Sequence, residues 1–337
     1  MIPAGLDLPF VWAGLIAFAV LAYVVLDGFD LGVGILFATT TEEEERNVMT
    51  ASIAPVWDGN ETWLVLGGGG LLAAFPLAYA VVMPALYAPI LVMLMALVFR
   101  GVAFEFRWRS TRSRGAWDAG FALGSLIAAF AQGIALGALV QGVAVENRAY
   151  AGGAFDWLTP FSLLTGVALV VGYALLGATW LIWKTSGPLQ ARMRRIATAA
   201  AWGTLAAIGL VSLATPFVNP AYFERWFGAP QVYYTVLVPA LTAGAAFALL
   251  RALKGERDAL PFLAALALFV LSFVGLGVSF HPNIVPPGLT IWDAAAPRES
   301  LAFLLAGAII LVPMVLGYTV YAYWTFRGKV DPAESYH

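Results

Sequence analysis

Nine long runs of apolar residues constrain the fold of this chain more than any other feature. Each run is close to, or longer than, the roughly 20 residues that a helix needs to span a bilayer, and 61% of the chain is hydrophobic while only 11% is charged. Lipid cannot satisfy a bare backbone, and the alternating pattern of a membrane barrel is absent. We therefore predict an all-α polytopic membrane protein with nine transmembrane helices at Pro9–Phe37, Ala51–Ala74, Leu77–Phe99, Trp117–Gln141, Pro160–Trp183, Ile196–Pro216, Val232–Leu250, Leu260–Phe280 and Leu301–Phe326.

The basic residues predict the orientation of these helices. Of the 18 Lys and Arg residues, 15 fall in the connections after odd-numbered helices or in the C-terminal tail. Basic connections stay on the cytoplasmic side, so the N-terminus is expected outside and the C-terminus inside. A count of eight or ten helices would break this alternation.

We expect residues 1–337 to form a single membrane domain. It would consist of a first helix (9–37) followed by one four-helix unit (51–184) and a second four-helix unit (196–327). One helix followed by two groups of four also raises the hypothesis of an internal duplication, although the two units do not align by eye.

The residue types that are missing exclude several kinds of chemistry. The chain has no cysteine, so disulfides, thiolate ligands and thiol catalysis are excluded. It has two histidines, His281 and His337, whereas haems with two histidine ligands need paired histidines within the helices. We expect no metal site and no haem in this chain, and the net charge of −2 argues against nucleic acid as a partner.

Acidic residues near the ends of three successive helices are the main functional signal. Asp27 and Asp30 end the first helix in "VLDGFDLGVG", Asp58 and Glu61 begin the second in "WDGNET", and the third ends with Arg100 and, beyond it, Glu105. The predicted topology places all six near the inner face. Acids inside spans cost about 2.5–3.5 kcal/mol each at the centre of a helix and usually mark ion or proton pathways.

Three interpretations of these acids stay open on this reasoning. They could relay protons for a larger complex, or serve a stand-alone proton-coupled transporter built from repeated helices. They could also serve helix packing alone, with Asp58 as a helix cap.

Three motifs resemble the second subunit of cytochrome bd-type quinol oxidases, including the cyanide-insensitive branch. They are "DGFDLGVG", "SIAPVWDGNETWLV" and "FRGVAFEFR", in the order and spacing of that family. The resemblance implies a respiratory-chain complex of the bacterial inner (cytoplasmic) membrane that oxidises quinol and reduces O₂ to water. It also implies that a first subunit holds the quinol site and all haems, two of type b and one of type d or a b-type replacement.

The resemblance further implies roles for single residues, none of them catalytic. Asp58 would lie on a cytoplasm-facing proton path to the partner's haem, and Trp63 would line an oxygen route. Asp30 and Arg100 match further motif positions. Asp27, Trp57, Asn60 and Glu61 are motif neighbours of less certain role. We predict a proton pathway through Asp58, Asp30, Asp27 and Glu61, with supporting roles for Arg100, Trp57, Asn60 and Glu105. Members of the family commonly have a small third subunit of one helix, and some carry a structural quinone. Membrane lipids and quinol complete the implied partners.

Overall fold

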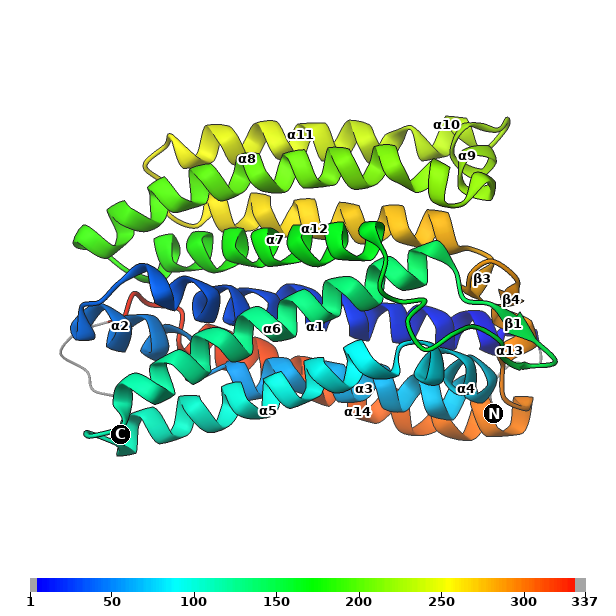
Figure 1. Ribbon diagram of the computed structural model, residues 1–337, viewed down its shortest axis with the longest axis horizontal. Coiled ribbons are helices and arrows are strands. Elements are labelled where there is room, and N and C mark those ends of the chain that lie inside the picture. Colours follow the sequence, from blue (N-terminus) through cyan, green and yellow to red (C-terminus); the bar gives the residue numbers. More distant parts are fainter. Residues whose placement is uncertain (1–4, 331–337) are drawn as a thin grey trace.

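The computed structural model describes residues 5–330 and shows an elongated bundle whose long helices run side by side (Figure 1). The long helices are α1 (Leu8–Leu36), α3 (Trp57–Ala74), α5 (Tyr87–Arg109), α6 (Arg114–Gln141), α7 (Pro160–Lys184), α8 (Gly187–Val218), α11 (Leu237–Leu253), α12 (Leu260–Phe280) and α14 (Arg298–Thr325). They form a membrane protein of predominantly helical fold, as predicted.

Shorter elements cover the two ends of the bundle. They are the 3₁₀ turn η1 (Phe37–Thr39), helices α2 (Glu43–Ile53), α4 (Pro76–Ala85), α9 (Pro220–Phe227), α10 (Val232–Thr235) and α13 (Ile291–Ala294), and strands β1 (Val145–Glu146), β2 (Ala149–Tyr150), β3 (Asn283–Val285) and β4 (Leu289–Thr290). The strands form two antiparallel pairs, β1–β2 and β3–β4. All four strands lie at one end of the bundle and α2 lies at the other (Figure 1). We call these the strand end and the α2 end.

Local sequence signals explain where several helices begin and end. The side chain of Asp7 accepts a hydrogen bond from the Phe10 amide and caps α1. Thr159 and Ser162 form a reciprocal capping box at the start of α7, where Pro160 occupies the first turn. Both arrangements satisfy amides that a helix N-terminus leaves free. α6 ends at Gly142, whose φ of 97° favours glycine.

α1 occupies the centre of the bundle and packs against α3, α6 and α7. Its contact with α7 is close because glycines face each other. A Cβ atom on Gly32 would lie 1.9 Å from the carbonyl oxygen of Tyr173, and one on Gly177 would lie 2.3 Å from the carbonyl carbon of Gly32. Small residues allow such approach between membrane helices. The "DGFDLGVG" glycines therefore bring the α2-end half of α1, with its two aspartates, deep into the protein.

Eight helices in the described part of the chain are long and apolar enough to cross a membrane. They are α1 with η1, α5, α6, α7, α8, α10 with α11, α12 and α14. Seven of the nine predicted spans coincide closely with one of these. α3 is not among the eight, so the count of nine spans stays a prediction.

The second and third predicted spans differ most from the structure. The segment predicted as one helix from Ala51 contains a break, because α2 ends at Ile53 and α3 begins only at Trp57. The segment predicted from Leu77 to Phe99 is divided into α4 and α5, and α5 continues to Arg109. Arg100 therefore lies inside a helix, nine residues from its end, and not at its terminus.

Candidate functional site

Asp27 and Asp30 form the buried centre of the candidate site. Both side chains are 0% exposed. They lie on neighbouring turns of α1 at i and i+3, so they share one side of the helix. Since burying an unpaired charge is very costly, the surrounding groups decide whether these carboxyls exist as anions.

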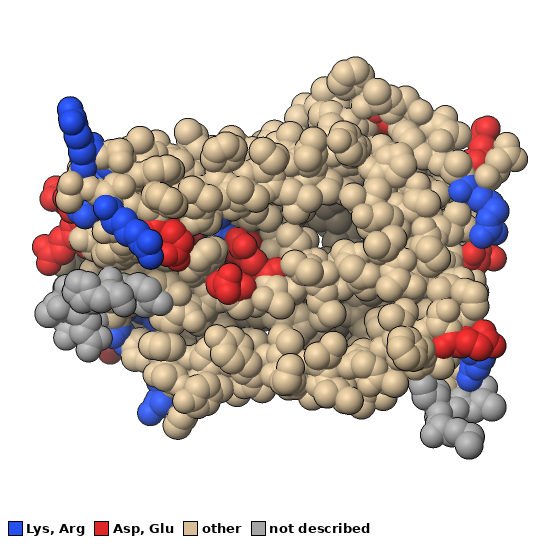
Figure 2. All heavy atoms as spheres, turned by 90° about the horizontal axis from the view of Figure 1, so that it is seen from below, with Lys and Arg blue, Asp and Glu red and all other residues tan. Residues whose placement is uncertain are grey.

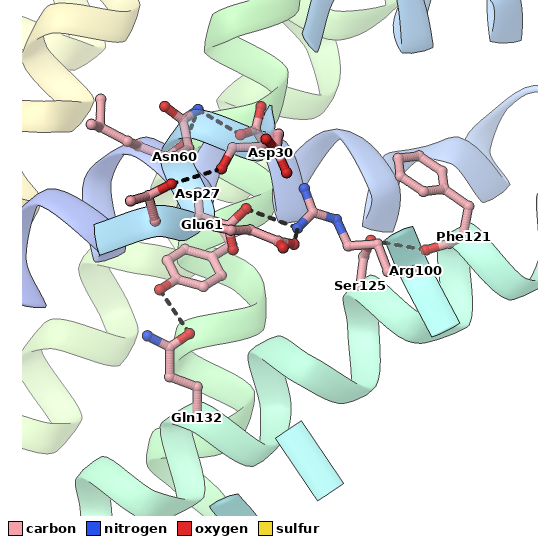
Figure 3. A network of polar contacts seen from close by, with 12 residues as sticks. Asp27, Asp30, Asn60, Glu61, Arg100, Phe121, Ser125 and Gln132 are labelled. Carbon is pink, nitrogen blue, oxygen red and sulfur yellow. Dashed lines mark hydrogen bonds and ion pairs between the residues drawn. The ribbon is translucent and has the colours of Figure 1, made fainter. Parts of the chain in front are cut away.

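Arg100 of α5 joins the acids of two other helices. Its Nη1 donates to Asp27 Oδ1 at 2.8 Å and to Glu61 Oε1 of α3 at 2.6 Å (Figure 3). The Arg100 side chain is 1% exposed, while that of Glu61 is 27% exposed. One guanidinium thus holds a fully buried carboxyl on one side and a carboxyl that reaches the surface on the other.

Asn60 of α3 connects the other aspartate to α14. Its Nδ2 donates to Asp30 Oδ2 at 2.6 Å, and its Oδ1 accepts from the Tyr323 hydroxyl at 3.0 Å. A crevice with a volume of about 10 Å³ lies between α3 and α14 next to this pair, lined by residues that include Gly59, Asn60, Tyr318 and Tyr323. That volume is about the smallest that holds one water molecule.

Several polar atoms of the site have no hydrogen-bond partner among the residues that the structure describes. They are the Tyr23 hydroxyl, Asp27 Oδ2, Asp30 Oδ1, Arg100 Nε and Arg100 Nη2. An unsatisfied buried polar group costs about 1–3 kcal/mol, and ordered water is the usual partner of such groups. These atoms gather around the two aspartates, so this is the part of the described structure where water or another polar group would complete the most hydrogen bonds.

The structure brings Asp27, Asp30, Asn60, Glu61 and Arg100 together but leaves two predicted residues outside this network. Asp58 is exposed because it lies two residues before Asn60, which is about 200° around a helix of 3.6 residues per turn. When Asn60 points inward to Asp30, Asp58 must point outward. Glu105 is also exposed, on the part of α5 beyond Arg100.

The two predicted tryptophans flank the network in different ways. The guanidinium carbon of Arg100 lies 5.8 Å from the ring centroid of Trp57, and this ring also contacts Phe104 at 5.1 Å between centroids. Trp63 is 1% exposed and packs with residues of α1 such as Ala19 and Tyr23. Trp57 therefore covers the guanidinium, whereas Trp63 belongs to the packing between α1 and α3.

A second buried ion-pair network, which the sequence reasoning missed, lies closer to the α2 end. Asp118 of α6 accepts from Arg107 Nε at 2.6 Å and from Arg46 Nη1 of α2 at 2.9 Å, and Arg107 also donates to Asn47 at 2.7 Å. Arg107 is fully buried. The sequence did offer a signal for this network. Asp118 lies about one turn inside α6, and the end of the preceding helix α5 is rich in arginine. This network fixes α2 across the ends of α5 and α6.

The described residues contain no group of three or more His, Cys, Asp and Glu side chains that could hold a metal ion. His281 directly follows α12 and its ring meets the ring of Phe10 edge to face at 6.4 Å. The other histidine, His337, lies outside the described residues. The polar chemistry of the site thus rests on carboxyl, guanidinium, amide and phenol groups, which exchange protons or order water.

Comparisons with known proteins agree on one family. A family model described as cytochrome bd terminal oxidase subunit II matches residues 8–326. The sequence is 33% identical to cytochrome bd-I ubiquinol oxidase subunit 2 of Escherichia coli (strain K12), covering 97% of this chain and 96% of the relative. It is 28% identical to cytochrome bd ubiquinol oxidase subunit 2 of Bacillus subtilis (strain 168), covering 96% and 97%.

A solved structure shows the same fold. One chain of the bd oxidase from Geobacillus thermodenitrificans matches with a TM-score of 0.76 over 96% of this chain and 100% of that chain, at 17% identity. The motifs around Asp27, Asn60 and Arg100 had predicted this relationship. The chain belongs to the cytochrome bd terminal oxidase subunit II family.

Proposed function

We propose that this chain, as subunit II of a quinol:O₂ oxidoreductase of the bd type, provides a proton path from the cytoplasm toward the haem-bearing subunit I. The observation that carries the proposal is the convergence of three helices on one buried arginine, with Asp27, Asp30 and Glu61 around it. Joining the helices does not require this arrangement, because apolar side chains could pack them together without burying charge. A stand-alone transporter is disfavoured by membership of the oxidase family.

The charge balance of the site assigns different tasks to its carboxyls. Arg100 supplies one positive charge and donates hydrogen bonds to Asp27 and Glu61. Among its described neighbours, the Asp30 carboxyl accepts a side-chain hydrogen bond only from the neutral amide of Asn60. Three anions beside one cation would leave a net buried charge, which is strongly disfavoured. Asp30 is therefore the carboxyl best placed to hold a proton, and Glu61 the one best placed to exchange protons with water.

The α2 end is proposed as the cytoplasmic side. The basic connections that predict this orientation include the segments around Arg107 and Arg192, which lie at this end in the structure. α3 is proposed as the ninth span, since its 18 residues rise about 27 Å. Its acidic first turns lower its mean hydropathy and explain why composition alone does not identify it. The division into two four-helix units is kept as part of this proposal.

The face formed by α3, α5 and α14 is proposed as the surface that meets the haem-bearing partner. Figure 2 shows acidic groups well inside an otherwise largely uncharged face, and Asp58 and Glu61 are the acids of α3 that reach the surface. A carboxylate facing lipid is costly, so this face requires a polar cover. A neighbouring subunit supplies that cover and also receives the protons.

The remaining implications of the resemblance are proposals of the same kind. The b-type and d-type haems and the quinol site would lie in the partner. A structural quinone and a one-helix third subunit would be accessory, and Trp63 would line an oxygen route.

The test is the complete oxidase complex carrying Asp58→Asn, Asp30→Asn or, as a matched control, Asp156→Asn in the exposed loop before α7. Quinol-driven O₂ consumption is measured per haem. We expect the first two variants to slow turnover at unchanged haem content and the control to behave as wild type. Undiminished turnover in both would refute the proton path. A loss of complex yield with normal turnover per haem would instead support a role in assembly alone.

A further inference from the structure

Tyr323 connects α14 to the acidic site. Among the described residues of α14, only Leu301, Leu305 and Ala322 are buried. Tyr323 follows Ala322 and is itself partly buried, and its hydroxyl donates to Asn60 Oδ1 of α3 at 3.0 Å. α14 therefore reaches the two aspartates of α1 through one phenol and one amide.

The ring of Tyr323 is held by aromatic side chains of α1 and α7. It meets the ring of Phe29 edge to face at 6.4 Å between centroids and that of Trp180 at 6.2 Å. Phe29 itself stacks on Trp180 at 4.2 Å and lies between Asp27 and Asp30 in the sequence. Because such ring contacts favour definite relative orientations, the segment of α1 that carries the two aspartates also fixes the position of the phenol.

The Asn60 amide presents opposite groups to its neighbours. A side-chain amide has one oxygen, which accepts hydrogen bonds, and one NH₂ group, which donates them. Because the Tyr323 hydroxyl donates to Oδ1, the NH₂ group faces Asp30 Oδ2 at 2.6 Å (Figure 3). The same NH₂ group donates to the Leu26 carbonyl oxygen at 3.4 Å. An amide turned by 180° would direct Oδ1 at two acceptor oxygens, unless Asp30 carried a proton on Oδ2.

The orientation of this amide decides which oxygen of Asp30 holds a proton. Oδ2 accepts from the Asn60 amide, whereas Oδ1 has no hydrogen-bond partner among the residues that the structure describes. A proton that reaches the carboxyl therefore forms its O–H bond at Oδ1. A proton on Oδ2 would be held in addition by the oxygen of a turned amide, and a hydrogen bond of that kind would slow its release.

We propose that Tyr323 is a positioning residue of the proton path, whose hydroxyl holds the Asn60 amide so that Asp30 takes up and releases its proton at Oδ1. This inference rests on the proposed function and adds to it a residue of α14 that lies outside the three sequence motifs. One O–H bond forms at Oδ1 when the carboxylate takes up a proton and breaks when the proton passes on. Tyr323 and Asn60 keep their own protons, and no electron moves.

The charged groups around Asp30 stay in place when the Tyr323 hydroxyl is removed. Those close enough to interact with the charge of Asp30 are Asp27 of α1, Glu61 of α3 and Arg100 of α5, and the phenol of Tyr323 is a further titratable neighbour. A phenol is neutral near pH 7. Tyr323→Phe therefore tests the orientation of the amide and leaves the charge of the site unchanged.

The test measures quinol-driven turnover per haem of the complete oxidase complex over a range of pH. Tyr323→Phe keeps the ring but leaves Asn60 Oδ1 without its donor, and an unsatisfied buried acceptor shifts such an equilibrium by roughly 5- to 150-fold. The turned amide then retains the protonated form of Asp30. We expect turnover to fall by roughly fivefold or more at acidic pH and to approach the wild-type rate as rising pH removes the retained proton.

Two further variants show whether Tyr323 acts through Asn60. Asn60→Leu removes the amide, so it should slow turnover at acidic pH as Tyr323→Phe does. Tyr323→Phe should add nothing in the Asn60→Leu background, since residues that act through one another are not additive. Tyr222→Phe is the matched control and should behave as wild type at every pH, because Tyr222 is also buried but donates to the Val140 carbonyl at 2.9 Å, near the strand end.

The outcomes separate this inference from the proton path itself. Wild-type turnover in Tyr323→Phe, together with a slow Asp30→Asn, would overturn the role of Tyr323 and leave the path standing, whereas normal turnover in Asp30→Asn would overturn both. A loss by the same factor at every pH would show that Tyr323 supports packing alone and would overturn its positioning role. If Tyr323→Phe does not assemble, Asn60→Leu decides, and its unchanged turnover at acidic pH would overturn the proposal.

Discussion

Removing the charge of Arg100 should destabilise this chain more than removing the charge of any exposed arginine. Arg100→Met keeps an apolar stem of similar length but leaves Asp27 without its 2.8 Å partner. Since both members of this pair are at most 1% exposed, the cost is that of breaking a buried ion pair, about 3–5 kcal/mol. Glu61 is 27% exposed, so water screens it and its share is about 0–1 kcal/mol.

A second substitution separates charge from packing. Arg100→Met combined with Asp27→Asn removes both charges, and the replacement of a whole buried pair by neutral groups is often nearly neutral. We expect the double variant to be more stable than Arg100→Met by at least about 2 kcal/mol, which is a large coupling for two residues in contact. Arg109→Met, at the exposed end of the same helix, is the matched control and should stay within about 0.5 kcal/mol of wild type.

The assay is unfolding of the solubilised complex by a denaturing detergent, followed by circular dichroism. A shift of about 3 kcal/mol changes the unfolding equilibrium by more than a hundredfold, so the effect is well outside measurement error. The reasoning is refuted if Arg100→Met unfolds within about 1 kcal/mol of wild type, or if Asp27→Asn fails to restore stability in its background.

Three other perturbations test the packing and the charges around this core. Gly32→Ala should destabilise the chain by about 1–3 kcal/mol or more through overpacking, because the new Cβ would lie 1.9 Å from a carbonyl oxygen of α7. Gly14→Ala is the control and should leave the stability unchanged, because nothing lies within 4 Å of its added Cβ. Equal denaturation midpoints for the two variants would contradict the overpacking. Partial burial raises the pKa of Asp258, but its ion pair with Lys329 and its hydrogen bonds lower that pKa by more. The net pKa of Asp258 is therefore below its ordinary value of 3.8. Stability from this group is present above its unfolded pKa and lost as pH falls through the lower folded pKa, and Asp258→Asn should remove that acid-side loss in pH-dependent unfolding. Lys184→Met should release the segment after α14, because the carbonyl oxygens of residues 326 and 328 accept hydrogen bonds from Lys184. Trypsin should then cleave this segment faster, and an unchanged cleavage rate would argue against a role of Lys184 in holding it.

Much of the fold was predictable because hydropathy and charge act over whole helices. The runs that became α6, α7, α12 and α14 are bounded by clear polar connections. The breaks before α3 and α5 were missed because apolar sequence continues across them. The prolines at positions 84 and 89 were the available signal for the break at Leu86, since proline disfavours a continuous helix.

The candidate site was predictable in its members but not in its pairings. The sequence places Asp27, Asp30, Glu61 and Arg100 at a similar depth, and topology then brings them within reach. It does not reveal that Arg100 forms ion pairs with two acids at once, or that Asn60 donates a hydrogen bond to Asp30. Those pairings depend on the rotation of α3 about its own axis, which α1 and α14 determine. Tyr323 and Asp118 were missed because a single polar residue in an apolar run carries no information about its partner.

The rotation of α3 links the buried site to the assembly of the complex. The same turn that directs Asn60 inward to Asp30 directs Asp58 outward, about 200° away. An outward carboxylate within a span costs as much as about 2.5–3.5 kcal/mol at the centre of a membrane and less toward its edges. On the proposed function, a partner that offers water or a hydrogen-bond donor would remove that cost, so Asp58 would favour association and would mark where the proposed proton path leaves this chain. A relay that ended inside this subunit would have no need of such a residue at its surface.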